Sequence, residues 1–148
     1  MRTGRTIAVR ARRRSRGSEL VEFALMLPGL AMLLLVVSQV AGAVATYQIL
    51  CNAAREGARL AVVPGEYGRT ADVQNTVAGY AAVNGIALAA GAVTVNQNEI
   101  VNPGGGACGV GNVCIQASRV AVAYTYVMGG LLGASMQLGA AAEMRNLY

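Results

Sequence analysis

The feature that most constrains this chain is a long stretch without any charged side chain, which extends from Phe23 to Ala54. Its first part, FALMLPGLAMLLLVVSQVAGAVAT (residues 23–46), is apolar almost throughout. A helix rises about 1.5 Å per residue, so these residues would reach roughly 36 Å, enough to cross the ~30 Å hydrocarbon core of a bilayer. The sequence therefore predicts a single membrane-spanning helix near the N-terminus.

The distribution of charge predicts the orientation of this helix. All 12 basic residues are arginine, and seven of them precede Gly17. Basic residues gather on the cytoplasmic flank of membrane helices, so we expect a cytoplasmic N-terminus and an exported C-terminal part. From Ser18 onward, five arginines stand against seven acidic residues, a balance of 5 − 7 = −2. The basic charge belongs to the tail, and without a basic face or stacking aromatic residues the pattern argues against nucleic-acid binding.

The helical pattern continues beyond the apolar span. In TYQILCNAAREGARLAVV (residues 46–63), one face of a 3.6-residue period is apolar or small and the other is polar. The apolar face holds Leu50, Ala53, Ala54, Gly57, Leu60 and Ala61, and the polar face holds Asn52, Arg55, Glu56 and Arg59. Glu56 and Arg59 have the spacing of a helical ion pair. We expect one helix from about Glu19 to Val62, which Pro64–Gly65 ends.

The remaining residues predict a small domain of mixed structure. A second helix should begin at Thr70 or Asp72 and end at Asn84–Gly85. Strands are predicted over residues 92–101, 113–127 and 135–144, and the last of these alternates with a clean period of two. The expected fold class is α+β: a long N-terminal transmembrane helix followed by a helix packed on an antiparallel three-stranded sheet.

The three cysteines favour a disulfide over a metal site. Cys108 and Cys114 bracket the glycine-rich segment CGVGNVC, and in an exported chain such a local pair predicts one disulfide. Metal binding is the competing interpretation, but the chain has no histidine and this pair alone supplies two ligands. The third cysteine, Cys51, is expected to be either buried and inert or a cross-link between subunits.

The residue combinations that catalysis requires are missing from the sequence. Without histidine there is no Ser/His/Asp or Cys/His arrangement. The acidic residues of the outer part are scattered, with no spacing typical of an acid/base pair: Glu56, Glu66, Asp72, Glu99 and Glu143. The glycine-rich NPGGGACGVGN (residues 102–112) lacks the strand-to-helix context and the GK[ST] ending of a phosphate-binding loop. We expect no enzymatic activity and no cofactor.

Two acidic residues, Glu19 and Glu22, interrupt the junction between the arginine-rich tail and the apolar span, where a plain secretory signal would not place them. The segment GSELVEF (residues 17–23) resembles the processing site of type IV prepilins, a glycine followed five residues later by a glutamate. With the apolar span and AAREGAR (residues 53–59), the chain is similar to the TadE/TadG-like minor pseudopilins of the tight-adherence (Tad/Flp) type IV pilus system. The resemblance covers residues 17–59, and GASMQLGAAAEMR (residues 133–145) is similar in a weaker way.

The resemblance implies roles for particular residues. A prepilin peptidase would cleave after Gly17 on the cytoplasmic side and leave Ser18 as the new N-terminus. Glu22 and its neighbour Phe23 would act in assembly, with Glu22 pairing with the α-amine of Ser18 on a neighbouring subunit. The candidate partner contacts are Arg55, Glu56, Gly57 and Arg59. The small residues of that segment can also pack on the chain's own sheet, and the two interpretations are compatible.

The implied domains are a basic leader over residues 1–17, a membrane-spanning and amphipathic helix over residues 18–62, and a pilin-like periplasmic or extracellular domain over residues 63–148. The implied function is to assemble or prime a pilus for surface attachment and biofilm formation. The implied partners are the prepilin peptidase, the major pilin, other minor pseudopilins, the platform proteins of the bacterial inner membrane, and membrane lipid.

Two other functions remain open on the sequence alone. The chain would be an anchored periplasmic protein if the span stays uncleaved. It would be a small secreted binding module if cleavage follows Ala45, because AVA (residues 43–45) fits a signal-peptidase site. The mature N-terminus distinguishes the three possibilities: Ser18 for the pseudopilin, a position near Met1 for the anchored protein, and Thr46 for the secreted module.

Overall fold

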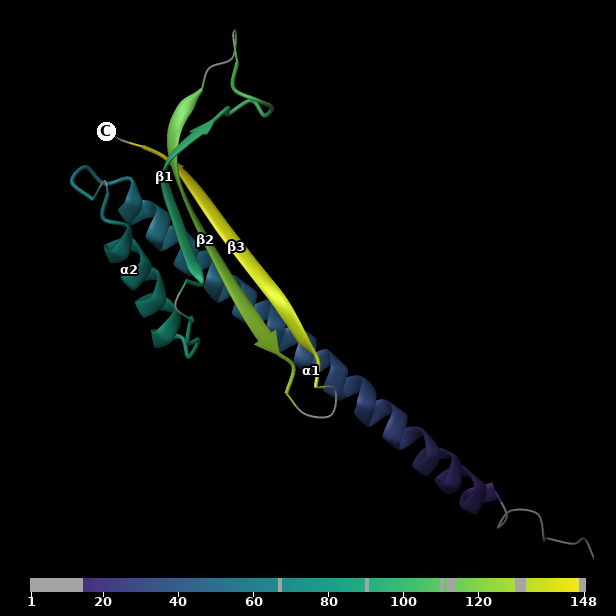
Figure 1. The fold of residues 1–148 in the computed structure, drawn as a ribbon. Coiled ribbons are helices and arrows are strands. Elements are labelled where there is room, and N and C mark those ends of the chain that lie inside the picture. Colours follow the sequence, from purple (N-terminus) through teal and green to yellow (C-terminus); the bar gives the residue numbers. More distant parts are fainter. Residues whose placement is uncertain are drawn as a thin grey trace, which may run out of the picture. The chain divides into compact units, whose positions relative to one another are not determined.

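The computed structural model describes residues 15–66, 68–89, 91–109, 111, 114–129 and 133–146, so most of the predicted leader lies outside the described residues. The elements are α1 (Ser15–Ala61), α2 (Thr70–Val83), β1 (Val93–Val101), β2 (Ile115–Val127) and β3 (Ser135–Arg145) (Figure 1). The chain divides into two compact units, Met1–Val40 and Ala41–Tyr148, and α1 contributes to both. The expected α+β fold class is confirmed.

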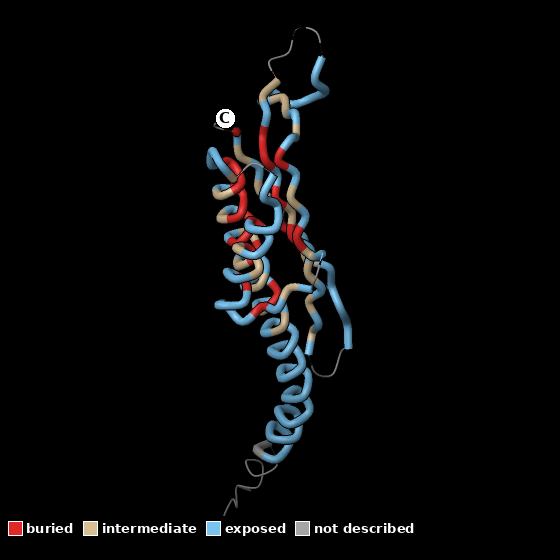
Figure 2. Tube along the Cα trace, turned by 60° about the vertical axis from the view of Figure 1, so that its left-hand side comes forward, coloured by how far each residue is buried: buried red, intermediate tan, exposed pale blue. Residues whose placement is uncertain are grey.

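The first part of α1 is apolar and exposed. Every side chain from Ser18 to Ser38 is exposed, which Figure 2 shows as an unbroken pale-blue run. The most apolar window of the helix has a mean hydropathy of 2.4, and none of that window is buried. Within the described residues, α1 is the one helix that is long and apolar enough to cross a membrane, by length and composition. It fits a membrane anchor.

The start of α1 differs from the prediction. The helix begins at Ser15 rather than near Glu19, and it ends at Ala61, next to the predicted end at Val62. No proline interrupts the residues before Glu19, and serine is favoured at the start of a helix, so the helical conformation extends further toward the N-terminus. The last residues of the predicted leader are therefore helical.

The three strands form one antiparallel sheet in the order β1–β2–β3. The central strand β2 carries Val122 opposite Val93 of β1 and Ala140 of β3. The register of β1 shifts between Asn96 and Glu99, where a β-bulge gives β1 one extra residue. Inward and outward side chains alternate on β2 from Ser118 onward, and on β3 they alternate from Gln137 onward, in line with the period of two predicted for that strand. One face of the sheet therefore carries the core residues.

The core of the unit Ala41–Tyr148 lies between the second half of α1, α2 and the sheet, where Figure 2 shows the buried residues in red. Its fully buried members include Leu50, Ala53, Ala54, Ala58, Ala61, Val73, Val77, Ala81 and Val120. A Cβ atom added to Gly57 would overlap Cγ2 of Val77 in α2 and lie 3.4 Å from Cγ1 of Val120 in β2. Gly57 therefore marks a close approach of α1 to both neighbours.

Three buried polar side chains form a hydrogen-bonded group at the C-terminal end of α1. Gln97 donates from Nε2 to the backbone oxygens of Ala61 (3.2 Å) and Glu66 (3.0 Å). Asn146 donates from Nδ2 to the backbone oxygen of Gln97 (3.0 Å) and accepts from Oγ of Ser118 (2.7 Å). We name Gln97, Ser118 and Asn146 the polar cluster. It joins the end of α1 to β1, β2 and the residue that follows β3.

Candidate functional site

The predicted cleavage bond, Gly17–Ser18, lies in the first turn of α1. Both residues are exposed, and a Cβ atom added to Gly17 would meet nothing within 4 Å. The first N–H groups of a helix have no intrahelical partner, so a first turn opens at little cost in hydrogen bonds. The predicted cleavage bond is therefore exposed and lies close to the start of the helix.

Glu22 follows Ser18 by one helical turn, at the edge of the apolar span. Its side chain is exposed, and its neighbour Phe23 is 63% exposed. Within the described residues, Glu22 takes part in no ion pair, whereas the acidic residues Glu56 and Glu66 do. A carboxylate at the edge of a hydrocarbon layer is costly unless it is paired. Glu22 is thus an exposed carboxylate without an ion pair among the described residues.

The four predicted contact residues of AAREGAR divide into two groups. Gly57 is buried against the chain's own core, while Arg55 and Arg59 are exposed. Glu56 is half-buried, and its Oε1 lies 3.1 Å from Nη2 of Arg59, which confirms the predicted ion pair. The small residues of this segment therefore pack internally, and the polar residues form the surface that remains open.

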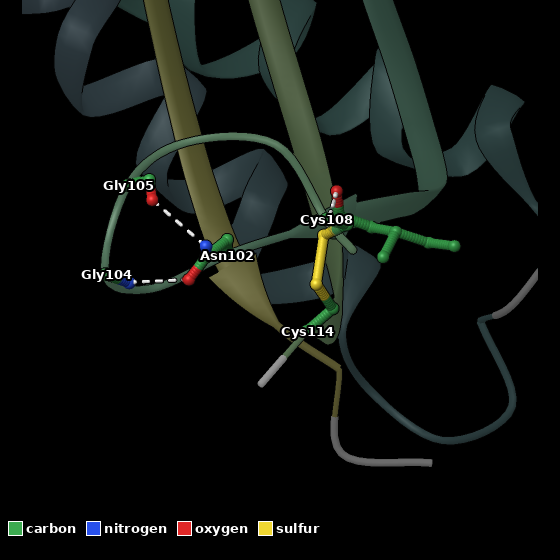
Figure 3. Close-up of a disulfide and its surroundings, with 6 residues drawn as sticks. Asn102, Gly104, Gly105, Cys108 and Cys114 are labelled. Atoms are coloured by element: carbon green, nitrogen blue, oxygen red, sulfur yellow. Dashed lines mark hydrogen bonds between the residues drawn. A yellow bond between two sulfur atoms is a disulfide. The ribbon is translucent and has the colours of Figure 1, made fainter. Parts of the chain in front are cut away.

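The loop between β1 and β2 carries a disulfide between Cys108 and Cys114, as predicted, with the two Cα atoms 6.0 Å apart (Figure 3). Ahead of it, Asn102 holds a tight turn: its Oδ1 accepts from the backbone N–H of Gly104 (2.9 Å), and its Nδ2 donates to the backbone oxygen of Gly105 (3.0 Å). Gly105 has a φ of 79°, a conformation that glycine adopts without strain. The glycines of this loop thus serve local turn geometry.

The third cysteine, Cys51, is a half-buried free thiol that packs against the core. In the ranges that the structure describes, no group of three or more His, Cys, Asp or Glu side chains could hold a metal ion. A shallow depression on the outer face of the sheet is lined largely by alanine and glycine, including Ala121, Gly139 and Ala141. This lining carries no charged side chain, and Thr94 supplies its one hydroxyl group. The candidate site is therefore the exposed N-terminal part of α1.

The polar cluster is the feature that the sequence analysis missed. Gln97 occurs in NQN (residues 96–98), where three successive polar residues give no contrast between the two faces of a strand. The available signal was positional, because Gln97 continues the inward series of Val93 and Val95 in the burial pattern of β1. Ser118 has the same signal, since it continues the inward series of Val120 and Val122 in β2, whereas Asn146 lies beyond the predicted strands.

Residues 17–59 match the family model described as TadE-like protein. The match begins at the glycine of the predicted cleavage bond and ends at Arg59, in the last turn of α1. It suggests involvement in Tad pilus systems, with pilus components as partners. No curated protein and no solved structure matches this chain.

Proposed function

We propose that this chain is a minor pseudopilin of a tight-adherence type IV pilus, which a prepilin peptidase cleaves after Gly17 and which then acts in assembly or priming of the pilus. The observation that carries the proposal is the extent of the TadE-like match, residues 17–59. It begins at the proposed cleavage bond and includes the whole exposed apolar part of α1. The role is structural, and the proposed partners are the peptidase, the major pilin, other minor pseudopilins and the membrane platform.

The proposed topology follows from charge and hydropathy. Arginines precede the apolar part of α1, so the N-terminus lies in the cytoplasm and the unit Ala41–Tyr148 lies in the periplasm or on a pilus. Export is consistent with the disulfide between Cys108 and Cys114, because the bacterial periplasm permits such bonds.

Glu22 supplies the proposed assembly contact. Cleavage after Gly17 gives Ser18 a positive α-amine, and a carboxylate at the hydrocarbon edge requires such a charge nearby. When the amine belongs to a neighbouring subunit, the pair fixes the axial register of the two helices. It does so mainly by penalising arrangements that leave Glu22 unpaired, since burying a charge pair adds little net stability.

The first test is the N-terminus of the membrane-extracted protein, measured by intact mass and N-terminal sequencing in cells with and without the prepilin peptidase. We expect a chain that begins at Ser18 and depends on the peptidase. A start at Thr46 would identify a secreted module, and an uncleaved chain in both strains would identify a plain membrane anchor. Either result would contradict the proposal.

The second test compares two acidic residues on the same exposed helix. Glu22→Ala should reduce incorporation into pilus fractions severely, because it removes the partner of the Ser18 amine. Glu19→Ala is the matched control, because Glu19 is an exposed glutamate of α1 three residues before Glu22. We expect this variant to be incorporated as well as the unmodified protein. Equal behaviour of the two variants would overturn the assembly role of Glu22.

A further inference from the structure

One end of the unit that comprises residues 41–148 carries no charge. No charged residue occurs in residues 41–54 of α1 or in residues 120–142, which form most of β2, the connection that follows it and most of β3. The fold brings these two segments together. Tyr126 of β2 lies against α1, so close that a Cβ atom added to Gly42 would stand 2.5 Å from the tyrosine Oη.

The charged residues of the sheet gather at its other end. Arg119 lies between Glu99 and Glu143, with a nitrogen–oxygen distance of 3.4 Å to each. This ion-pair row crosses all three strands. The sheet is therefore polarised along its length, with ion pairs at one end and only uncharged side chains at the other.

Apolar side chains are exposed at the uncharged end. Val127, the last residue of β2, is 65% exposed, and Met136, near the start of β3, is 38% exposed. The backbone N–H of Met128 donates to the oxygen of Ala134 (2.9 Å), which continues the hairpin beyond the strands. Figure 1 shows this end of β2 and β3 beside α1. We name Tyr126, Val127, Met128 and Met136 the hairpin end.

We propose that the hairpin end is a second membrane contact, which enters the headgroup and upper acyl layer of the bilayer beside α1. The inference rests on the proposed membrane span of α1. A span takes about 20 helical residues, and counted from Phe23 these end at Gly42, the residue that Tyr126 contacts. Tyrosine is favoured at the membrane interface, because its ring is apolar and its hydroxyl reaches water or headgroups.

Lipid is the occupant that the observations favour. The hairpin end includes Tyr126, which lies against Gly42, the residue at which the proposed membrane span ends, and it has no charged group that a bilayer would exclude. An apolar segment held at the interface inserts roughly 5–10 Å, which is about the length of two or three strand residues. The contact would restrain the outer unit at the membrane surface before its transfer to a pilus.

The test places a fluorescent label at defined positions of the full chain in phosphatidylcholine vesicles that contain nitroxide-labelled lipid. The background carries Cys51→Ser, so that each new cysteine is the only free thiol. Labels are attached after Val127→Cys, Ile100→Cys or Leu33→Cys. Ile100 is the matched control, because it is a strand residue exposed to a similar degree, 62%, at the end of the sheet that carries the ion pairs. Leu33 reports on the span itself.

We expect several-fold stronger lipid quenching at position 127 than at position 100, together with strong quenching at position 33. Quenching at 33 with equal, weak quenching at 127 and 100 would overturn the hairpin contact and leave the proposed span intact. A label at 127 that is shielded from water but not quenched by lipid would assign the hairpin end to a protein partner and also overturn the inference. Absence of quenching at 33 would overturn the span and the hairpin contact together.

Discussion

At the scale of single residues, Gly57 has the most demanding position in the chain. It sits on α1 where Val77 of α2 and Val120 of β2 both approach, and an added Cβ atom would overlap Cγ2 of Val77. Valine has a stiff χ1 angle and cannot swing its methyl group away freely. The small side chain is thus required for packing inside the unit, independently of any partner.

Gly57→Ala should therefore destabilise the protein, although alanine is the better helix former. Overpacking costs roughly 1–3 kcal/mol, and the gain in helix propensity offsets up to about 1 kcal/mol, so we expect a net loss of the order of 1 kcal/mol. Gly79→Ala is the matched control, because Gly79 is an exposed glycine of α2 with nothing within 4 Å of an added Cβ. That change should stabilise by about 0.5–1 kcal/mol. Chemical unfolding in detergent measures the unfolding free energy of both variants. If the two substitutions changed this free energy in the same direction, the close packing at Gly57 would be contradicted.

At the scale of the elements, the end of α1 depends on a side chain from β1. Gln97 is only 6% exposed. Its Nε2 donates hydrogen bonds to the backbone oxygens of Ala61 and Glu66, and its Oε1 accepts one from the backbone N–H of Gly68 (2.8 Å). Ala61 is the last residue of α1, where carbonyls lose their intrahelical partners, and Glu66 and Gly68 lie in the connection that follows. Gln97 lies in the β-bulge of β1, so the irregularity of this strand supplies the side chain that hydrogen-bonds to the end of α1.

Gln97→Leu should cost about 2–4 kcal/mol of unfolding free energy, because each buried group left without a partner costs roughly 1–3 kcal/mol. Asn98→Leu is the control, since Asn98 is an exposed neighbour on the same bulge, and surface changes of this kind stay within about 0.5 kcal/mol. Thermal unfolding followed by circular dichroism separates the two. A loss below about 1 kcal/mol for Gln97→Leu would mean that water satisfies these groups instead.

The elements themselves could be predicted because their periods are plain in the sequence. Residues 135–144 follow a period of two and residues 46–63 a period of 3.6, so most of the burial follows from the pattern, although Met136 is exposed. The hydrogen bonds of the polar cluster could not be predicted, because they join residues far apart in sequence, such as Gln97 and Asn146. The contact between Gly42 and Tyr126 is equally long-range. Glu22 was identified through resemblance, since one acid beside a span has no unique physical meaning.

At the scale of the whole molecule, the second half of α1 is part of the outer unit rather than a stalk that carries it. The compact unit begins at Ala41, and its core cluster includes five residues of α1: Leu50, Ala53, Ala54, Ala58 and Ala61. Without them, the inward valines of β2 would face water. Residues 63–148 alone therefore lack the part of the core that α1 contributes.

Two truncated chains test this dependence. A fragment of residues 41–148 should fold and unfold cooperatively in mild detergent, because it retains every member of the core cluster. A fragment of residues 63–148 should show no cooperative transition, because a sheet covered by one short helix buries too little apolar surface for so small a domain. A peptide of residues 41–62, added to the shorter fragment, supplies the missing part of the core. It should restore the cooperative transition, which would show that the shorter fragment is not simply misfolded. Cooperative unfolding of the 63–148 fragment alone would show that α1 is dispensable to the outer unit.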